Sequence, residues 1–189
     1  KIYYNEFNVG YGPSCNIGAE KSTGDYLIFL NADTEVTHGW IESIVELLKN
    51  PTIGIVGNLH IKKGGMWDNT IDSAGSEWRW DSMCFSHLGR NSYNRNNIPV
   101  PFTVKNAPED LLQTDEREMV TGCCFGIRRD LFEEIGGFDS NYRIGCWEDS
   151  DICLKVREKG YKILFQPNSV IYHKLSHNNY ESHIYTGHN

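Results

Sequence analysis

The stretch GDYLIFLNADT, residues 24–34, decides the fold of this chain. Residues 26–30 form a continuous apolar run of strand length, which is typical of a parallel strand buried on both faces. A polar cluster follows the run at once, at Asn31, Ala32, Asp33 and Thr34. We therefore expect a buried strand whose carboxyl end carries polar side chains.

The polar cluster has two interpretations. In open α/β sheets, ligands bind just outside the carboxyl ends of the strands. An aspartate at such a position can hold a hard divalent cation that bridges two phosphates of a bound nucleotide-sugar, since such cations take oxygen ligands and few protein carboxylates. Alternatively, Asp33 only closes a turn or caps the next helix. The stretch by itself leaves both interpretations open.

Helical and strand-like segments alternate around this stretch. Gly10, Gly12 and Pro13 mark a turn and the start of a helix that runs to about Ser22. Apolar spacing predicts a helix over 38–49 and a short strand over 53–56. This alternation indicates an α/β fold with a mixed, mostly parallel sheet flanked by helices.

The remaining segments follow the same logic. Residues 62–118 are polar and weakly periodic. We expect a strand around 77–80, and a segment this long inside a domain is typical of a binding loop or lid. Residues 1–5 are strand-like, and residues 176–189 are expected to be a polar tail. Further elements are expected as a strand over 120–127, helices over 129–135 and 149–159, and strands over 161–165 and 169–172 split by Pro167.

Composition excludes several classes of function. The 189 residues are 39% hydrophobic and 23% charged, which is ordinary for one globular domain with a sizeable core. A net charge of −7 argues against a nucleic-acid or anionic-membrane surface. No apolar run approaches the ~20 residues that span a bilayer. The six cysteines lack zinc-site spacing, so we expect reduced thiols in a cytoplasmic protein. Parts of the protein outside this chain could attach it to the inner face of a membrane.

A second polar cluster, GCWEDSD at residues 145–151, precedes the helix predicted over 149–159. Carboxylates at a helix N-terminus are stabilised by the helix dipole, which is sufficient as a structural explanation. The functional interpretation is a general base beside an acceptor-binding carboxylate, because sugar transfer with inversion requires removal of the acceptor hydroxyl's proton. Trp147 offers a flat face for a sugar ring, although it could equally be a core residue.

His173 ends the last predicted strand. A lone histidine at such a position is more often structural than a ligand. However, Asp33 and His173 are both predicted at strand ends, so the two side chains could share one cation.

The motifs together resemble the family 2 glycosyltransferases, whose fold is called GT-A. NVGYG (8–12) and NIG (16–18) are similar to its donor-side turn and helix, and GDYLIFLNADT to its strand and metal motif. IDSAG (71–75) is similar to a motif of the rhamnosyltransferase-like branch. TGCCFGIRR (121–129), GGFD (136–139) and EDSDICL (148–154) resemble the acceptor-side strand and helices. The resemblance covers nearly all of residues 1–175, which we treat as the larger, C-terminal part of a catalytic domain.

The resemblance also implies roles for individual residues. Asp149 would be the catalytic base. Asp33 would be the metal and diphosphate ligand, with His173 as a further ligand to Mn²⁺ or Mg²⁺. The donor would also meet Asn8, Asn16 and Asn31, and the acceptor would meet Trp147, Glu148, Gly122 and Cys123.

Two departures from the family pattern matter. Asn31 stands where the family has the first aspartate of its Asp-x-Asp motif, which lowers the charge available to a metal. In addition, residues 1–5 resemble the family's third strand, so the two preceding strands that hold the nucleotide base are absent. We therefore expect an N-terminally incomplete domain that is completed by a preceding segment or another chain.

The expected function is an inverting glycosyltransferase that moves a sugar from a UDP-, dTDP- or GDP-linked donor to a saccharide or glycoconjugate hydroxyl. Residues 62–118 would be an acceptor-side insertion within the domain. The alternative is a non-catalytic carbohydrate- or nucleotide-binding module on the same scaffold. A nucleotidyltransferase would need a Gly- and Arg-rich phosphate loop near its start, and none is visible.

Overall fold

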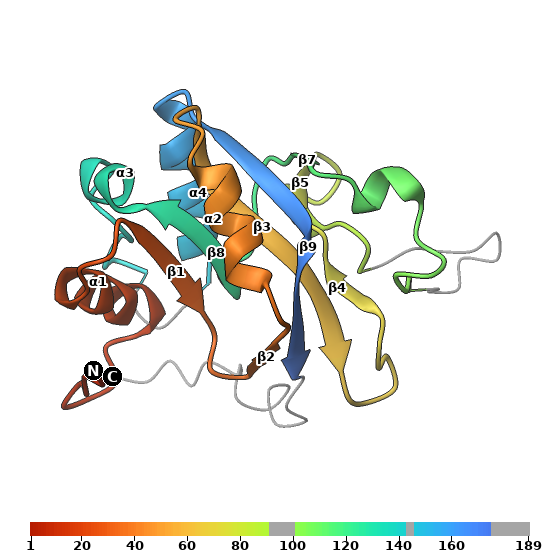
Figure 1. Ribbon diagram of the computed structural model, residues 1–189, viewed down its shortest axis with the longest axis horizontal. Helices are drawn as coiled ribbons and strands as arrows, with labels where there is room; N and C mark the ends of the chain where they lie inside the picture. The colour runs from red at the N-terminus through yellow and green to blue at the C-terminus, as the bar shows by residue number, and fades with distance from the viewer. Residues whose placement is uncertain (91–100, 143–145, 175–189) are drawn as a thin grey trace.

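The apolar run 26–30 forms strand β1 (Tyr26–Leu30), as its sequence predicts. In the computed structural model, which describes residues 1–90, 101–142 and 146–174, β1 lies at one end of a sheet of seven strands (Figure 1). The order of its main path is β1-β8-β3-β9-β2. These strands are β8 (Cys124–Arg128), β3 (Ile53–Lys63), β9 (Lys162–Lys174) and β2 (Thr34–Val36).

The sheet is mixed. Its longest ladder, between β3 and β9, is parallel. The other ladders of the described residues are antiparallel, including those of the short strands β4 (Ile71–Ser73) with β3 and β7 (Asp115–Glu116) with β9. The sheet is mixed, as expected. Strands β1, β3 and β9 run in the same direction, whereas β8 inserts between β1 and β3 and runs opposite to both.

Helices cover both faces of the sheet (Figure 1). On one face, α1 (Tyr11–Lys21), α3 (Arg129–Glu134) and α4 (Glu148–Glu158) pack against a cluster that includes Leu27 and Phe29 of β1. On the other face, α2 (Trp40–Leu48) packs with Tyr26 and Ile28. Alternate side chains of β1 therefore enter different cores, which explains its unbroken apolar sequence.

Strand β9 corrects the expectation of two strands split by Pro167. It is one strand, with a register shift in which Asn58 pairs with Gln166 while the next residue, Leu59, pairs with Val170. The residues around Pro167 are thereby left out of the ladder, and this bulge accommodates a residue that cannot donate a backbone hydrogen bond.

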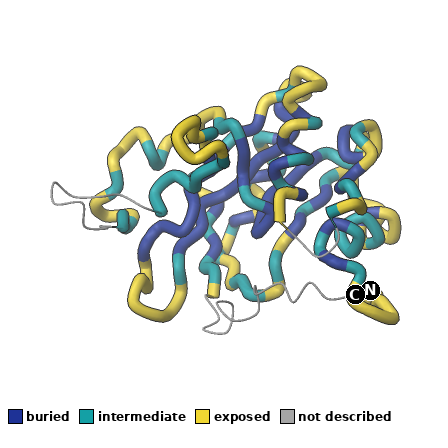
Figure 2. Tube along the Cα trace, turned by 180° about the vertical axis from the view of Figure 1, so that it is seen from behind, coloured by how far each residue is buried: buried dark blue, intermediate teal, exposed yellow. Residues whose placement is uncertain are grey.

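Two further segments refine the sequence-based description. Residues 1–5 form no strand, contrary to expectation; they are exposed, and in the described part of the chain no strand pairs with them (Figure 2). The polar segment 62–118 carries β4, the hairpin of β5 (Ser76–Arg79) and β6 (Cys84–His87), a 3-10 helix (Glu109–Leu112) and β7. The strand expected around 77–80 is thus present as β5.

Some predicted segments lie outside the described residues. These are the polar tail expected over 176–189 and Gly145 of the acidic motif. Among the helices of the described ranges, none has both the length and the apolar character required to cross a bilayer.

Candidate active site

Three segments that are distant in sequence meet at one end of the sheet. Asn31, the residue after β1, donates its backbone N–H to the carbonyl of Cys123 at 2.9 Å, just before β8. Thr34 of β2 is paired with His173 near the end of β9, and the Lys174 N–H donates to the Asp33 carbonyl at 2.8 Å. Backbone pairing therefore places the polar cluster of residues 31–34 beside β9.

Asp33 and His173 come together as the sequence suggests. Asp33 Oδ2 lies 3.4 Å from His173 Nε2, with 38% and 19% of the two side chains exposed. The Asn31–Thr34 turn is fixed by a 2.6 Å hydrogen bond from the Thr34 hydroxyl to the Asn31 carbonyl. A carboxylate oxygen and an imidazole nitrogen facing each other at a half-open surface form a donor set that a divalent cation can use.

This donor set is small. Within the described ranges, no group of three or more His, Cys, Asp or Glu side chains is arranged to hold a metal ion. Two protein ligands nevertheless suit a cation that takes its remaining ligands from substrate phosphates and water, as Mg²⁺ commonly does. The site fits a cation bound together with a diphosphate better than one bound by protein alone.

The other nitrogen of His173 has a buried partner. Nδ1 lies 3.0 Å from Oδ2 of Asp72, on β4, whose side chain is only 3% exposed. The hydrogen bond to Asp72, followed by the Cys123 thiol, raises the pKa of His173 to about 10. Burial alone would raise the pKa of Asp72, but the hydrogen bond from His173 and the charge of Arg90 together hold it well below its usual range.

Asp149, the predicted base, lies in the first turn of α4 and is hydrogen-bonded to Gly122, in the segment just before β8. Its Oδ2 accepts the backbone N–H of Gly122 at 3.0 Å, and its Oδ1 accepts the N–H of Ser150 at 2.8 Å. The Gly122 carbonyl in turn accepts the hydroxyl of Tyr11 from α1. Since Gly122 and Cys123 are consecutive, the anchor of Asp149 adjoins the backbone contact of Asn31.

Trp147 and Glu148 lie in a strained turn at the start of α4. Cys146 and Trp147 have φ values of 82° and 74°, a left-handed conformation that non-glycine residues rarely adopt. The turn leaves Trp147 54% exposed while Glu148 is 9% exposed. Glu148 Oε2 is buried without a hydrogen-bond partner among the described residues. Burial, and then the charge of Asp149, raise the pKa of Glu148.

Two side chains predicted to contact the donor, those of Asn8 and Asn16, are hydrogen-bonded to backbone groups. Asn8 Oδ1 accepts the N–H of Gly10 at 2.9 Å, ahead of α1. Both polar groups of the Asn16 amide bond to the backbone of Phe138, at 2.8 and 3.0 Å. The structure therefore gives these two side chains backbone partners that hold α1 in place.

Sequence reasoning missed two residues at this end of the sheet. Asp72 stands in the sequence only as part of a family motif, although an aspartate in the apolar context IDSAG is a signal for a buried, partnered carboxylate. Tyr11 gave no signal, because its bond to Gly122 joins residues 111 positions apart. Both act on groups that the sequence did identify, namely His173 and Asp149.

Solved structures share this architecture. The chain superposes on GalNAc-T7 solved with UDP, GalNAc and Mn²⁺ with a TM-score of 0.69 and 27% identity, covering 92% of this chain and 32% of that one. A mannosyltransferase from Pyrobaculum calidifontis, in complex with GDP-Man and Mn²⁺, gives a TM-score of 0.56 at 18% identity over 92% of this chain and 39% of that one. The fold is thus the GT-A fold of nucleotide-sugar glycosyltransferases, as expected.

The family follows from the sequence. Residues 1–136 match glycosyl transferase family 2, and residues 110–181 match the N-terminal domain of galactosyltransferase. The chain therefore belongs to glycosyl transferase family 2.

Curated relatives include N-acetylgalactosaminyltransferase 7 of Rattus norvegicus, which is 28% identical over 92% of this chain. The O-antigen biosynthesis protein RfbC of Myxococcus xanthus is 26% identical over 85% of this chain. The chain spans only 26% and 12% of the length of these two relatives.

Proposed function

We propose that the protein is an inverting glycosyltransferase that moves a sugar from a nucleotide-diphosphate donor to a hydroxyl of a saccharide or glycoconjugate acceptor. One observation carries the proposal. The backbone N–H of Gly122 donates to the Asp149 carboxylate, and the carbonyl of the next residue, Cys123, accepts the backbone N–H of Asn31. The predicted base and the segment that carries the predicted metal ligand Asp33 are therefore both hydrogen-bonded to residues 122–123. A base and a donor site must lie this close for in-line attack on the anomeric carbon.

The donor side of the proposal rests on Asp33 and His173. These two side chains would hold Mn²⁺ or Mg²⁺, which supplies charge neutralisation for the diphosphate leaving group when bound. Asn31, two residues before Asp33, would offer an uncharged oxygen to the donor. UDP-, GDP- and dTDP-linked sugars are all donors compatible with such a site, since the cation meets only the diphosphate. The UDP and GDP-Man complexes of the two structural neighbours support this class of ligand.

On the acceptor side, each residue has a separate task. Asp149 would accept the proton of the acceptor hydroxyl, because its carboxylate is held in place by two backbone N–H groups and retains free lone pairs. The buried Glu148 Oε2, unpartnered within the described ranges, would accept a hydrogen bond from a second acceptor hydroxyl. The exposed face of Trp147 would pack on a sugar ring.

Asn31 favours a second candidate function, a carbohydrate- or nucleotide-binding module without catalysis. Loss of a carboxylate from the metal motif weakens cation binding and would be tolerated in a module that only binds. The anchored Asp149 argues for the enzyme, because a binding module gains little from a carboxylate held in this way.

The test is a transfer assay. The full-length protein is incubated with Mn²⁺, each nucleotide-sugar and a panel of saccharide acceptors, and the anomeric configuration of the product is read by proton NMR. The proposal expects transfer with inverted configuration. Retained configuration would contradict the role of Asp149, and donor binding without any turnover would favour the non-catalytic module.

We also propose that transfer serves polysaccharide biosynthesis on the cytoplasmic side of the membrane. The six cysteines are all at described positions and all unpaired, which agrees with a reducing compartment.

A further inference from the structure

Asp72 is a buried carboxylate that the proposed reaction does not use. It lies on β4 with 3% of its side chain exposed. Three basic side chains surround it: Arg90 Nη2 at 2.9 Å, His173 Nδ1 at 3.0 Å and Lys62 Nζ at 3.9 Å. A buried charge is costly unless it is paired and hydrogen-bonded, so a carboxylate here requires these partners.

Arg90 fixes the position of Asp72 through two groups at once. Its Nη2 contacts the carboxylate, and its Nε donates to the Asp72 carbonyl at 3.0 Å. The aspartate is therefore held from both its side chain and its backbone. A group held in this way imposes a direction on its remaining hydrogen-bond partner, His173.

Other histidines nearby have different partners. His60 Nε2 lies 2.7 Å from Asn58 Oδ1, and His87 Nδ1 lies 2.9 Å from the hydroxyl of Ser76. Among the histidines that the structure describes, only His173 is hydrogen-bonded to Asp72, and it is also the one that faces Asp33. The carboxylate is thus directed at the candidate metal ligand rather than at the histidines in general.

We propose that Asp72 is a positioning residue for His173. By accepting the Nδ1–H, it fixes the tautomer and the ring orientation that leave Nε2 facing Asp33. Metal-binding histidines commonly give their second N–H to a carboxylate in this way, which orients the ring and increases its basicity as a ligand. The inference rests on the proposed function, because it requires Asp33 and His173 to hold a cation.

A purely structural role for Asp72 makes a different prediction. If Asp72 only ties Arg90 and Lys62 to β4, then removing Arg90 should disturb the site as much as removing Asp72. If Asp72 acts on His173, loss of the carboxylate should affect metal binding beyond any effect of Arg90. Arg90→Gln is therefore the informative control.

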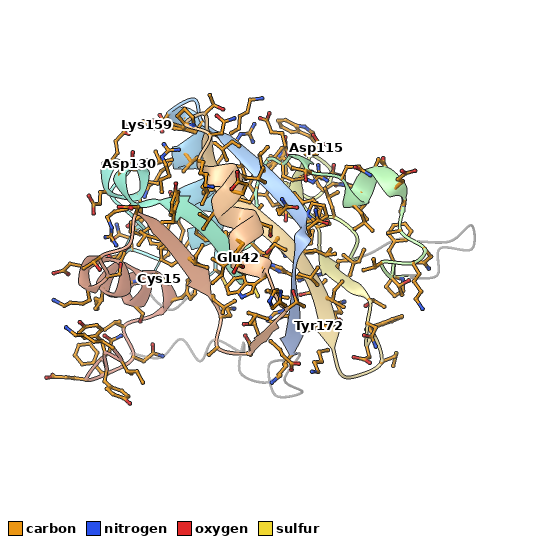
Figure 3. The ribbon with its side chains drawn as sticks, in the orientation of Figure 1. Cys15, Glu42, Asp115, Asp130, Lys159 and Tyr172 are labelled. Atoms are coloured by element: carbon orange, nitrogen blue, oxygen red, sulfur yellow. The ribbon has the colours of Figure 1, made fainter. Side chains whose placement is uncertain are left out.

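The experiment measures the Mn²⁺ affinity of the full-length protein by water-proton relaxation, alone and with UDP, GDP or dTDP present, and thermal melts establish folding. The variants are Asp72→Ala, Asp72→Asn, Arg90→Gln and Asp115→Asn. Asp115 is an exposed aspartate paired with Phe165 near the start of β9, whereas Tyr172 and His173 lie near the end of that strand (Figure 3). It therefore controls for loss of one carboxylate.

We expect Asp72→Ala to weaken Mn²⁺ binding by about 10- to 100-fold. Asp72→Asn, which still accepts a hydrogen bond from Nδ1–H, should lose less. Arg90→Gln should also lose less than Asp72→Ala, because the carboxylate remains beside Nδ1, and Asp115→Asn should stay near the parent. Because Asn preserves shape, it keeps the test valid if Asp72→Ala fails to fold.

Two results would overturn the inference. If the parent binds Mn²⁺ and both Asp72 variants match it, or lose no more than Arg90→Gln does, Asp72 has no positioning role and the proposed function is untouched. If the parent binds no Mn²⁺ in the presence of any of these nucleoside diphosphates, the proposed metal site fails, and the inference fails with it.

Discussion

The backbone N–H of Gly122 donates to the carboxylate of Asp149 at 3.0 Å, across 27 residues of chain. The carbonyl of the same glycine receives the Tyr11 hydroxyl. One residue therefore sets the position of the proposed base relative to both α1 and the start of β8. The space around Gly122 is correspondingly tight, since an added Cβ would lie 3.2 Å from Asp149 Cβ.

Gly122→Ala should displace Asp149 by a few tenths of an ångström and lower kcat by roughly tenfold, because small misplacements of a catalytic group are costly. Steady-state kinetics with the donor saturating would measure this. Gly18→Ala is the matched control, because an added Cβ there meets nothing within 4 Å. Equal activity of the two variants would show that the Gly122 contact does not position the base.

Asp149→Asn should lower kcat by about 10²-fold or more while donor affinity stays nearly unchanged, because the amide cannot accept the acceptor's proton. Kinetics and calorimetric donor titration measure the two effects separately. Asp151→Asn, on the same helix, removes only a carboxylate that pairs with Lys155 at 2.8 Å, and should keep near-parent turnover. Undiminished turnover in Asp149→Asn would remove Asp149 from the role of base.

Asp33→Ala should weaken Mn²⁺ and donor binding together, each by at least about tenfold, because the cation links the carboxylate to the diphosphate. Removing the metal with EDTA should weaken donor binding of the parent to a similar extent, and adding EDTA to the variant should change little more. Donor affinity that is indifferent to both the substitution and the chelator would exclude a metal-bridged diphosphate.

Glu148→Gln should make the protein more stable and less active at neutral pH. The pKa of Glu148 is raised by burial, so its contribution to stability is fully present below the usual glutamate value and is lost as pH rises through the raised one. At pH 7 the charged side chain is therefore unfavourable, and the neutral glutamine removes this cost. Thermal melts from pH 4 to pH 8 should show a higher Tm for the variant only toward the upper end. A constant difference across the range would contradict a titrating Glu148.

Much of the fold was predictable because its signals are local. The apolar run of β1, the amphipathic pattern of α2 and the glycine that ends α4 each lie within one element. The single strand β9 was not predictable, because Pro167 normally interrupts a ladder, and only pairing with β3 shows that a bulge accommodates it. The antiparallel insertion of β8 also depends on long-range pairing rather than on local sequence.

The residues of the candidate site also form two groups, those with a local sequence signal and those whose role depends on distant partners. Asp33, His173 and Asp149 were predicted from motifs at strand or helix ends, and the structure places the first two in contact. Asn16 has the expected motif, but its amide serves the backbone of Phe138, which no spacing in the sequence could indicate. Asp72 and Tyr11 act through partners 101 and 111 residues away, so their roles emerge only once the sheet is assembled.

Calorimetric titration with UDP-, GDP- and dTDP-sugars, with and without Mn²⁺, shows whether Asp33 and His173 form a metal-dependent nucleotide-sugar site. We expect one donor to bind in the presence of Mn²⁺ and to bind more weakly when the metal is withheld. Donor binding that is the same with and without Mn²⁺ would contradict a metal-bridged diphosphate at these residues.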